Sequence, residues 1–434
     1  MKMNVAALAL AVPLSLLAAG LLRADAPCPL RDAVECSPRS GLPHVFAALS
    51  TGGEARVAFL GGSITAQDGW RPKTLAWLRG RFPGAKIGEI NAAIGGTGSD
   101  LGVFRLDHDV LERRPDLLFV EFAVNDGGAA PERIHKAMEG IVRKTWAANP
   151  ATDICFVYTV AENMLPDLEA GHFPRSASAM EAVAEHYGIP SIHMGLEAAR
   201  LVKAGQLVFK ANPQTDEEKK ALAGKTVFSP DGVHPHPDTG HRLYLEAVAR
   251  SLERIQALPK AERPAALPPP LRADNWERAR MIPLSAASRS DGWEHLDAGV
   301  NALAKSFGNR LPELWRAGQP GAKLTLRFKG TLAGVYDLLG PDGGQVSVQL
   351  DGGPARVVPR FDGYCTYHRL AMLMAGEELP EGMHTVTFTL DAGAPDKAAI
   401  LFEHNRPDLR QHPEKYAANV WHAGALMLIG EPVP

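Results

Sequence analysis

The chain has 434 residues, which is enough for two or three domains and a large core and excludes a small disulfide-stapled protein. It carries 46 Lys and Arg, 49 Asp and Glu, a formal net charge of −3 and 45% hydrophobic residues. This composition excludes extended disorder and a polyanion-binding protein, so we expect no nucleic-acid partner. The four cysteines show no C-x-x-C pair and predict neither a zinc finger nor a redox motif. Cys28 and Cys36 are close enough in sequence to bridge a short loop.

The first 26 residues have the pattern of a secretory signal peptide. Lys2 precedes an apolar run over residues 5–22, and Ala24-Asp25-Ala26 follows as a small-x-small cleavage pattern. The alternative is an uncleaved membrane anchor, because the apolar run is long for a signal peptide. We expect cleavage after residue 26, a secreted or periplasmic mature protein, and no membrane association after cleavage.

Residues 56–258, preceded by a lead-in segment at 27–55, are predicted to form an α/β domain. Short apolar runs predict buried parallel strands, since they are near-continuous rather than alternating: 57–60, 86–90, 117–122, 154–159 and 189–193. Amphipathic stretches between them, such as 72–81 and 131–147, predict helices. The expected architecture is three layers, with helices covering both faces of a five-stranded parallel sheet.

The pattern changes after residue 258. Residues 259–275 begin with a proline-dense stretch that cannot continue a helix, and they are predicted to be a linker. Residues 276–434 contain short, often alternating runs that Gly, Asp and Pro turns are expected to separate, and they predict an antiparallel β-sandwich: 323–328, 332–338, 345–350, 355–359 and 384–390. Upstream of this boundary, the polar segment 203–225 is a long insertion placed just before Asp231.

Ser63 is the first candidate for chemistry. The run Val-Ala-Phe-Leu leads directly into Gly61-Gly62-Ser63, so a serine sits in a glycine-rich turn at the carboxyl end of a strand. Such a turn projects the hydroxyl above the sheet, where backbone N–H groups can stabilise an anion. A phosphate-binding loop is the alternative, but neither a G-x-x-x-x-G-K-[ST] nor a G-x-G-x-x-G pattern is present.

Asp231 and His234 supply the base that a serine nucleophile needs. Because the two residues are three positions apart on a turn, the carboxylate can hold one imidazole nitrogen while the other faces the serine. The non-catalytic alternative for Asp231 and His234 is an ordinary polar loop ahead of a helix. A metal site built from His234, His236 and His241 is a further alternative, although the H-E-x-x-H spacing and a clear carboxylate ligand are missing.

Two segments offer donors for a developing oxyanion. Asn91-Ala-Ala-Ile-Gly95-Gly96-Thr97 follows the second strand and presents backbone N–H groups, and Asn125 follows the third strand with a side-chain amide. An ordinary glycine turn and an Asn-Asp helix cap are the alternatives.

These four motifs, each at the carboxyl end of a predicted strand, resemble the SGNH (GDSL-like) hydrolase superfamily over roughly residues 56–250. The resemblance implies a flavodoxin-like α/β/α fold, Ser63 as nucleophile, and Asp231 and His234 as its partners. It places the oxyanion donors at Ser63, Gly96 (with Gly95 as the adjacent alternative) and Asn125. Two departures occur: Gly-Gly-Ser replaces Gly-Asp-Ser, and Ala-Val-Asn-Asp replaces Gly-x-Asn-Asp.

The implied reaction is acyl transfer through an acyl-enzyme, with neither a metal nor an organic cofactor. Secretion and the accessory β domain favour an O-acetylesterase acting on an acylated polysaccharide or oligosaccharide. A general carboxylesterase or lipase and a non-catalytic glycan-binding protein are the alternatives. Asp68, Trp70 and Arg71 are expected at the pocket wall, with packing against the following helix as the alternative for Trp70. Five β-domain aromatics are candidates for stacking on sugars, although each is more typical of a core: Trp293, Trp315, Tyr364, Tyr367 and Trp421.

Overall fold

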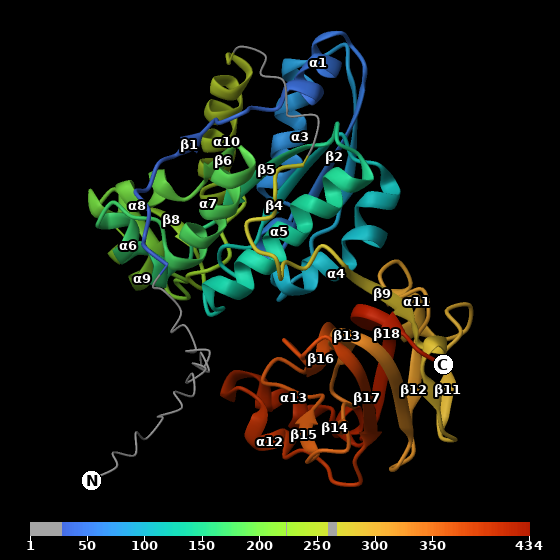
Figure 1. Ribbon diagram of the computed structural model, residues 1–434. Helices are drawn as coiled ribbons and strands as arrows, with labels where there is room; N and C mark the ends of the chain where they lie inside the picture. The colour runs from blue at the N-terminus through green and yellow to red at the C-terminus, as the bar shows by residue number, and fades with distance from the viewer. Residues whose placement is uncertain (1–27, 223, 259–266) are drawn as a thin grey trace, which may run out of the picture.

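The computed structural model describes residues 28–222, 224–258 and 267–434. The predicted signal peptide at 1–26 and most of the proline-dense stretch, residues 259–266, lie outside the described residues. Within the described ranges, an α/β domain is followed by a β-sandwich domain (Figure 1). No helix in these ranges has the length and apolar character needed to cross a bilayer.

A six-stranded sheet forms the centre of the α/β domain, in the order β1-β6-β5-β4-β2-β3. Its strands are β1 (Cys36–Ser37), β2 (Glu54–Gly61), β3 (Lys86–Asn91), β4 (Leu117–Glu121), β5 (Asp153–Tyr158) and β6 (Ser191–His193). Strands β2 to β6 are parallel, which confirms the predicted parallel sheet. The lead-in segment adds β1, which pairs antiparallel with β6 at one edge.

Helices cover both faces of this sheet. One face carries α1 (Pro43–Ser50), α3 (Trp70–Arg81), α8 (Leu196–Lys203) and α10 (Gly240–Gln256), and the other carries α4 (Ser99–Asp109), α5 (Pro131–Ala148) and α7 (Arg175–Tyr187). Alternate residues of β2 enter the two cores: Val57 and Phe59 pack with the first group, and Ala58 and Leu60 with the second. Burial on both faces is the reason that the strand sequences are continuously apolar.

The strand order creates a topological switch point at β2. Its parallel neighbours are β3 on one side and β4 on the other, so the chain reverses its direction of winding there. Loops that follow β3 and β4 therefore diverge on either side of the loop after β2. In open α/β sheets this crevice is where ligands bind.

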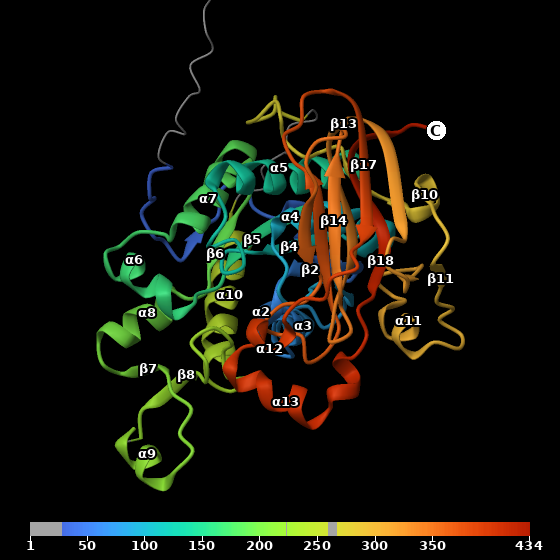
Figure 2. The ribbon, with the colours of Figure 1, turned by 90° about the horizontal axis from the view of Figure 1, so that it is seen from below.

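The predicted insertion at 203–225 forms an excursion beside the sheet (Figure 2). It contains β7 (Leu207–Lys210) and α9 (Asp216–Ala221) and leads into β8 (Thr226–Ser229), which pairs parallel with β7. Two short helices, α2 (Ser63–Ala66) and α6 (Leu165–Glu169), are the remaining α-helices among the described residues of this domain.

The second domain is built from antiparallel strand pairs, as predicted. Its strands are β9 (Ala279–Pro283), β10 (Ser288–Arg289), β11 (Trp293–His295), β12 (Trp315–Ala317), β13 (Lys323–Leu339), β14 (Gln345–Leu350), β15 (Arg356–Pro359), β16 (Arg369–Gly376), β17 (Gly382–Leu390) and β18 (Trp421–Pro432). Three short helices accompany them: α11 (Ala302–Phe307), α12 (Lys397–Ile400) and α13 (Arg406–Gln411).

The predicted strands at 323–328 and 332–338 are a single strand, β13, so the turn expected between them is wrong. Gly330 does not form a turn: it lies where β13 meets β18, and the register shifts between Gly330 and Leu332. A Cβ on Gly330 would overlap the carbonyl oxygen of Ile429, and Gly430 opposite has φ of +147°. The glycines allow close backbone approach at a bulge.

The two domains share a core. One apolar cluster runs from α4 and α5 of the first domain into the second, where it includes Trp276, Leu311, Tyr336 and Met427. Glu139 of α5 is buried and accepts backbone N–H groups within the predicted linker, at Leu271 and Arg272, the latter at 2.9 Å. A large apolar interface restricts relative domain motion, so the β-sandwich is a fixed part of the molecule.

The suggested bridge between Cys28 and Cys36 is not formed, and all four cysteines of the described residues are free thiols. Cys36 is buried in the core that contains α1 and α10, whereas Cys28 packs against the core that contains α4 and α5. The two thiols thus belong to opposite sides of the sheet.

Candidate active site

Ser63 is the first residue of α2, and only Gly62 separates it from the end of β2. The glycine that precedes it leaves space for a neighbour, because a Cβ on Gly62 would overlap Oδ1 of Asn125 and lie 2.7 Å from its Cγ. Glycine in place of the superfamily's aspartate therefore allows the Asn125 side chain to lie against the serine turn.

A hydrogen-bonded chain connects Ser63, His234 and Asp231. The Ser63 Oγ lies 2.8 Å from Nε2 of His234, and Nδ1 of the same ring lies 2.7 Å from Oδ2 of Asp231. The two ring nitrogens face the two partners that the sequence predicted, across 171 residues of chain. With Nδ1 donating to the carboxylate, Nε2 is left free to accept the serine proton.

The Asp231 carboxylate is held by several donors. Its Oδ1 accepts the backbone N–H groups of Val233 and His234, each at 2.8 Å, and the Ser229 hydroxyl at 3.0 Å. Burial by itself would raise the pKa of Asp231, but these hydrogen bonds and the one from the imidazole hold it well below its usual value. Asp231 is therefore an anion throughout the range in which a histidine titrates.

The loop of residues 91–97, here called the glycine loop, lies beside the serine. A Cβ on Gly95 would lie 3.6 Å from Cβ of Ser63, and Gly96 has a left-handed φ of +72°. Together with Asn125, this loop flanks Ser63 on the two sides expected from the strand order. The structure thus brings all of the predicted site residues together.

A buried carboxyl group supports the serine turn from below. Glu121, at the end of β4, accepts the hydroxyls of Thr65 at 2.8 Å and Thr159 at 2.6 Å and the backbone N–H of Gly62. Its burial raises its pKa. The carboxyl of Asp126, next to Asn125, accepts the N–H of Ser99 at 3.0 Å, and its burial raises its pKa to about 7. Sequence reasoning missed both groups because each lies inside an apolar or turn segment.

The pocket above Ser63 has walls from both domains. Its volume is about 450 Å³. The α/β domain contributes Ser63, Ile94, Gly95, Gly96 and His234, and the β domain contributes Phe307, Tyr364, Tyr367, His368, Arg369 and Leu370. Nη1 of Arg369 would lie 3.6 Å from a Cβ on Gly96, so the β domain touches the glycine loop itself.

The aromatic candidates divide accordingly. Tyr364 and Tyr367 are 53% and 59% exposed at this pocket. Trp421 is fully buried, and Trp293 packs against it with ring centroids 5.3 Å apart. Trp315 stacks instead with the Arg289 guanidinium. Two of the five aromatics are therefore placed to meet a ligand.

The predicted pocket wall of Asp68, Trp70 and Arg71 is wrong. Trp70 is fully buried with its ring against Phe59 and Phe119, and the Asp68 side chain is 93% exposed. Arg71 is buried and pairs with Asp68 and a neighbouring glutamate. Trp70 and Arg71 begin helix α3, and none of the three residues lines the pocket above Ser63, despite their closeness to it in sequence.

The alternative metal site at His234, His236 and His241 is not assembled. His234 is committed to Ser63 and Asp231, and Nδ1 of His241 accepts the Trp70 N–H at 3.1 Å while its Nε2 bonds Gln67. Within the described ranges, one other group has metal-ligand character: Asp342, His368 and His422. In that group each carboxylate oxygen of Asp342 lies within hydrogen-bond distance of an imidazole nitrogen, at 2.7 and 2.9 Å. The ligand atoms of the three residues therefore already bond to one another.

Residues 59–243 match the model of the GDSL-like Lipase/Acylhydrolase family. This segment is similar to a family of acyl hydrolases, and the resemblance inferred from the motifs is confirmed. No curated protein sequence matches the chain.

Similar solved structures include two of a two-domain esterase (CEX) active on acetylated mannans, one of them co-crystallized with mannopentaose. The sequence identity is 21% for both, with TM-scores of 0.68 and 0.67. The matches cover 92% and 91% of this chain and 97% of each of the other chains, so the similarity of fold extends over both domains.

Proposed function

We propose that the protein is a secreted serine esterase that removes O-acetyl groups from a polysaccharide or oligosaccharide. The observation that carries this proposal is the composite pocket, in which the Ser63–His234–Asp231 chain opens beneath two exposed tyrosines of the β domain. The family of the first domain accounts for ester hydrolysis, and the second domain accounts for the preference for a sugar.

The nucleophile is Ser63. Nε2 of His234 takes the hydroxyl proton as Oγ attacks the ester carbonyl, and the anionic Asp231 stabilises the imidazolium that forms. The oxyanion is held by the backbone N–H groups of Ser63 and Gly96 and by the Asn125 amide. Each donor is worth about 3–4 kcal/mol in a site from which water is excluded.

The protonated imidazole then donates to the leaving sugar hydroxyl, and an acyl-enzyme remains on Ser63. His234 next activates a water, which attacks the acyl carbonyl and releases acetate and free serine. Every proton transfer in this scheme uses a side chain of the protein.

The β-domain wall supports a carbohydrate substrate. Exposed aromatic rings offer flat apolar faces with a polar edge, which suit the faces of pyranose rings. Arg369 lies over the Tyr364 ring at 5.3 Å and pairs with Asp362, which holds both in place beside the glycine loop. The similarity in fold to a two-domain esterase active on acetylated mannans supports an acetylated polysaccharide, of which acetylated mannan is the first candidate.

Secretion is part of the proposal and depends on residues 1–26. The positive residue, apolar run and small-x-small pattern predict export and cleavage, which would place the enzyme among extracellular or periplasmic polymers. N-terminal sequencing of the mature protein tests this part directly, because export with cleavage leaves a chain that begins at residue 27.

The test of the enzymatic proposal is acetate release from acetylated mannan and acetylated xylan, with 4-nitrophenyl acetate and octanoate as small esters. Ser63→Ala is the control, and its melting temperature should equal that of the wild type. Serine-dependent acetate release from a polymer supports the proposal. Hydrolysis of the octanoate alone would instead indicate a general carboxylesterase, and glycan affinity without any acetate release would indicate a binding protein.

A further inference from the structure

The glycine loop depends on contacts from outside the α/β domain. Two of its backbone N–H groups bond to β2: that of Ala92 donates to the Phe59 carbonyl at 2.9 Å, and that of Ile94 to the Gly61 carbonyl at 3.0 Å. Two further hydrogen bonds lie within the loop, from the Ala93 N–H to Oδ1 of Asn91 at 3.1 Å and from the Thr97 hydroxyl to the Ile94 carbonyl at 2.8 Å. Two consecutive carbonyls at the start of the loop, those of Asn91 and Ala92, accept from arginine side chains instead. A loop with two adjacent glycines has little intrinsic rigidity, so these side chains matter for its position.

The first of these side chains is Arg105, from α4. It is 1% exposed, and its guanidinium donates to the Ala92 carbonyl and, at 3.3 Å, to the carbonyl of Gly61. Gly61 is the last residue of β2 and lies two positions before Ser63. One buried guanidinium therefore connects the start of the glycine loop to the strand that carries the serine.

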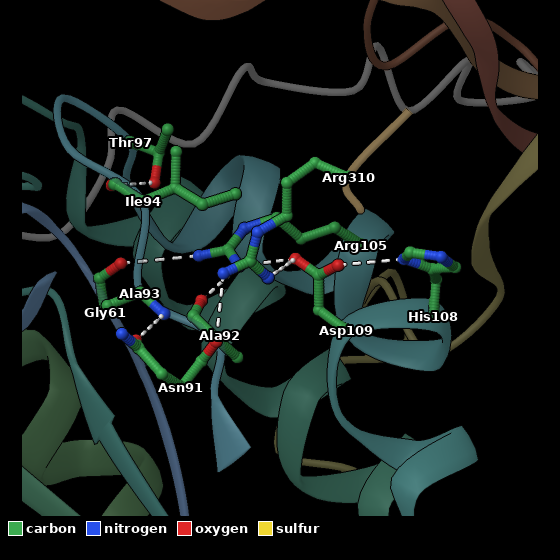
Figure 3. Close-up of polar contacts among 10 residues, drawn as sticks. All are labelled: Gly61, Asn91, Ala92, Ala93, Ile94, Thr97, Arg105, His108, Asp109 and Arg310. Atoms are coloured by element: carbon green, nitrogen blue, oxygen red, sulfur yellow. Dashed lines mark hydrogen bonds and ion pairs between the residues drawn. The ribbon is translucent and has the colours of Figure 1, made fainter. Parts of the chain in front are cut away.

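The second side chain, Arg310, comes from the β domain, between α11 and β12. Its Nη2 donates to the Asn91 carbonyl at 2.9 Å, and its Nη1 lies 3.1 Å from Oδ2 of Asp109. Figure 3 shows the two guanidinium groups side by side, directed at the loop carbonyls from the same side.

Asp109 joins the two arginines. Its Oδ2 accepts from Arg105 at 2.8 Å, and its Oδ1 lies 2.9 Å from Nδ1 of His108 (Figure 3). Burial alone would raise the pKa of Asp109, but the hydrogen bond from His108 and the two guanidinium charges lower it, so the group is an anion. Without this anion, two buried cations would face each other unshielded.

The network borders a cavity of about 270 Å³ between the domains. Both arginines and Asp109 line it, together with Tyr336 of β13, whose buried hydroxyl has no hydrogen-bond partner among the described residues. Removal of the Arg310 side chain would open this cavity to the loop carbonyls, so the loop would lose a charged donor and gain room to move.

We propose that Arg310 is a positioning residue for the ester hydrolysis of the neighbouring domain. Through the Asn91 carbonyl and the Asp109–Arg105 pair, it fixes the glycine loop and its oxyanion N–H groups relative to Ser63. The β domain is then required for turnover of any ester, including a small aryl acetate that never reaches its tyrosines. The expected loss of kcat rests on the proposed serine mechanism. The expected change in the position of the glycine loop does not.

The experiment compares Arg310→Gln, Arg310→Lys and the control Glu377→Gln in the full-length protein. Glu377 of the β domain pairs with Arg133 of α5, so the control removes another ion pair across the domain interface without touching the glycine loop. The assay is 4-nitrophenyl acetate hydrolysis, with kcat expressed per active site titrated with a fluorophosphonate. Hydrogen–deuterium exchange of residues 91–98 reports the loop itself.

Arg310→Gln should lower kcat about 10-fold, with KM within about twofold of the wild type, and should accelerate exchange in residues 91–98. Arg310→Lys should give intermediate values of kcat and loop exchange. A lysine ammonium lacks the planar, forked geometry with which a guanidinium contacts the Asn91 carbonyl and the Asp109 carboxylate together. Glu377→Gln should change neither readout. An Arg310→Gln protein whose kcat and loop exchange equal those of the control overturns the inference.

If Arg310→Gln does not fold, the lysine variant decides by the same two readouts. If the wild-type protein lacks serine-dependent hydrolysis, the proposed function fails and loop exchange alone decides the positioning role. Unchanged exchange then overturns it, and accelerated exchange confined to residues 91–98 supports it.

Discussion

Gly62→Ala tests the contact between the serine turn and the Asn125 amide. In the superfamily motif this position is aspartate, whereas here a Cβ would overlap Oδ1 of Asn125 and lie 2.7 Å from its Cγ. Non-bonded carbon atoms pack at about 3.5–4.0 Å. The amide therefore has to retreat by about 1 Å from its position beside Ser63.

A displacement of this size is large on the scale of catalysis. Misplacement of a catalytic group by about 1 Å costs about 100-fold, and the complete loss of one oxyanion donor costs about 100- to 1,000-fold in kcat. We expect Gly62→Ala to lower kcat about 100-fold, with a small change in KM, because the amide acts on the transition state and not on the bound ester.

The assay is 4-nitrophenyl acetate hydrolysis by Gly62→Ala, Asn125→Ala and the double variant. If the methyl group acts by displacing the amide, the double variant should have the kcat of Asn125→Ala alone. Gly128→Ala is a matched control in the loop after β4, since a Cβ there meets nothing within 4 Å. A Gly62→Ala enzyme with wild-type kcat, or effects that multiply in the double variant, would refute the reasoning.

Three further predictions concern the β domain and the pH dependence of stability. Tyr367→Ala should raise KM for an acetylated polysaccharide about 3- to 10-fold and leave 4-nitrophenyl acetate hydrolysis unchanged, because one stacking contact is worth about 1 kcal/mol. Asp337 is fully buried and bonds Arg360 at 2.7 and 2.6 Å and Trp421 at 2.9 Å, so Asp337→Asn should cost about 3–5 kcal/mol in urea unfolding. A smaller loss would show that water reaches Arg360. Burial raises the pKa of Asp126 from 3.8 to about 7, so the folded state keeps a proton that the unfolded chain releases at lower pH. Stability should therefore fall as pH rises from 4 to 7, more steeply than in Asp126→Asn, and equal slopes in urea unfolding would contradict this assignment.

Much of the α/β domain could be predicted because its signals are local. Apolar runs specify buried parallel strands, and the rule that ligands bind at their carboxyl ends places the glycine turn, the glycine loop and Asn125 together. Asp231 and His234 are three residues apart, so their geometry needs only a turn. These residues are the ones that the structure brings within hydrogen-bond distance of Ser63 or beside it.

Prediction failed where closeness in sequence was taken for closeness in space. Trp70 lies seven residues after Ser63, yet the helix that begins there directs its ring into the core. Gly330 looked like a turn, because the sequence does not show which strand approaches it. The Trp70 ring packs against strands of the core, and the missing side chain of Gly330 lets another strand approach. In both positions the residue is explained by an element that is distant in the chain.

The sequence by itself therefore determined the fold class and the acyl-hydrolase motifs. It also predicted Ser63 as the nucleophile, His234 as the base and Asp231 as the carboxylate that holds the base. Only the tertiary structure showed that the second domain lines one side of the pocket and contacts the glycine loop. Arg310 and Arg369 lie more than 200 residues from the loop and belong to no motif. Their role comes from the shared apolar core, which fixes one domain against the other, and such long-range packing has no local pattern in a single sequence.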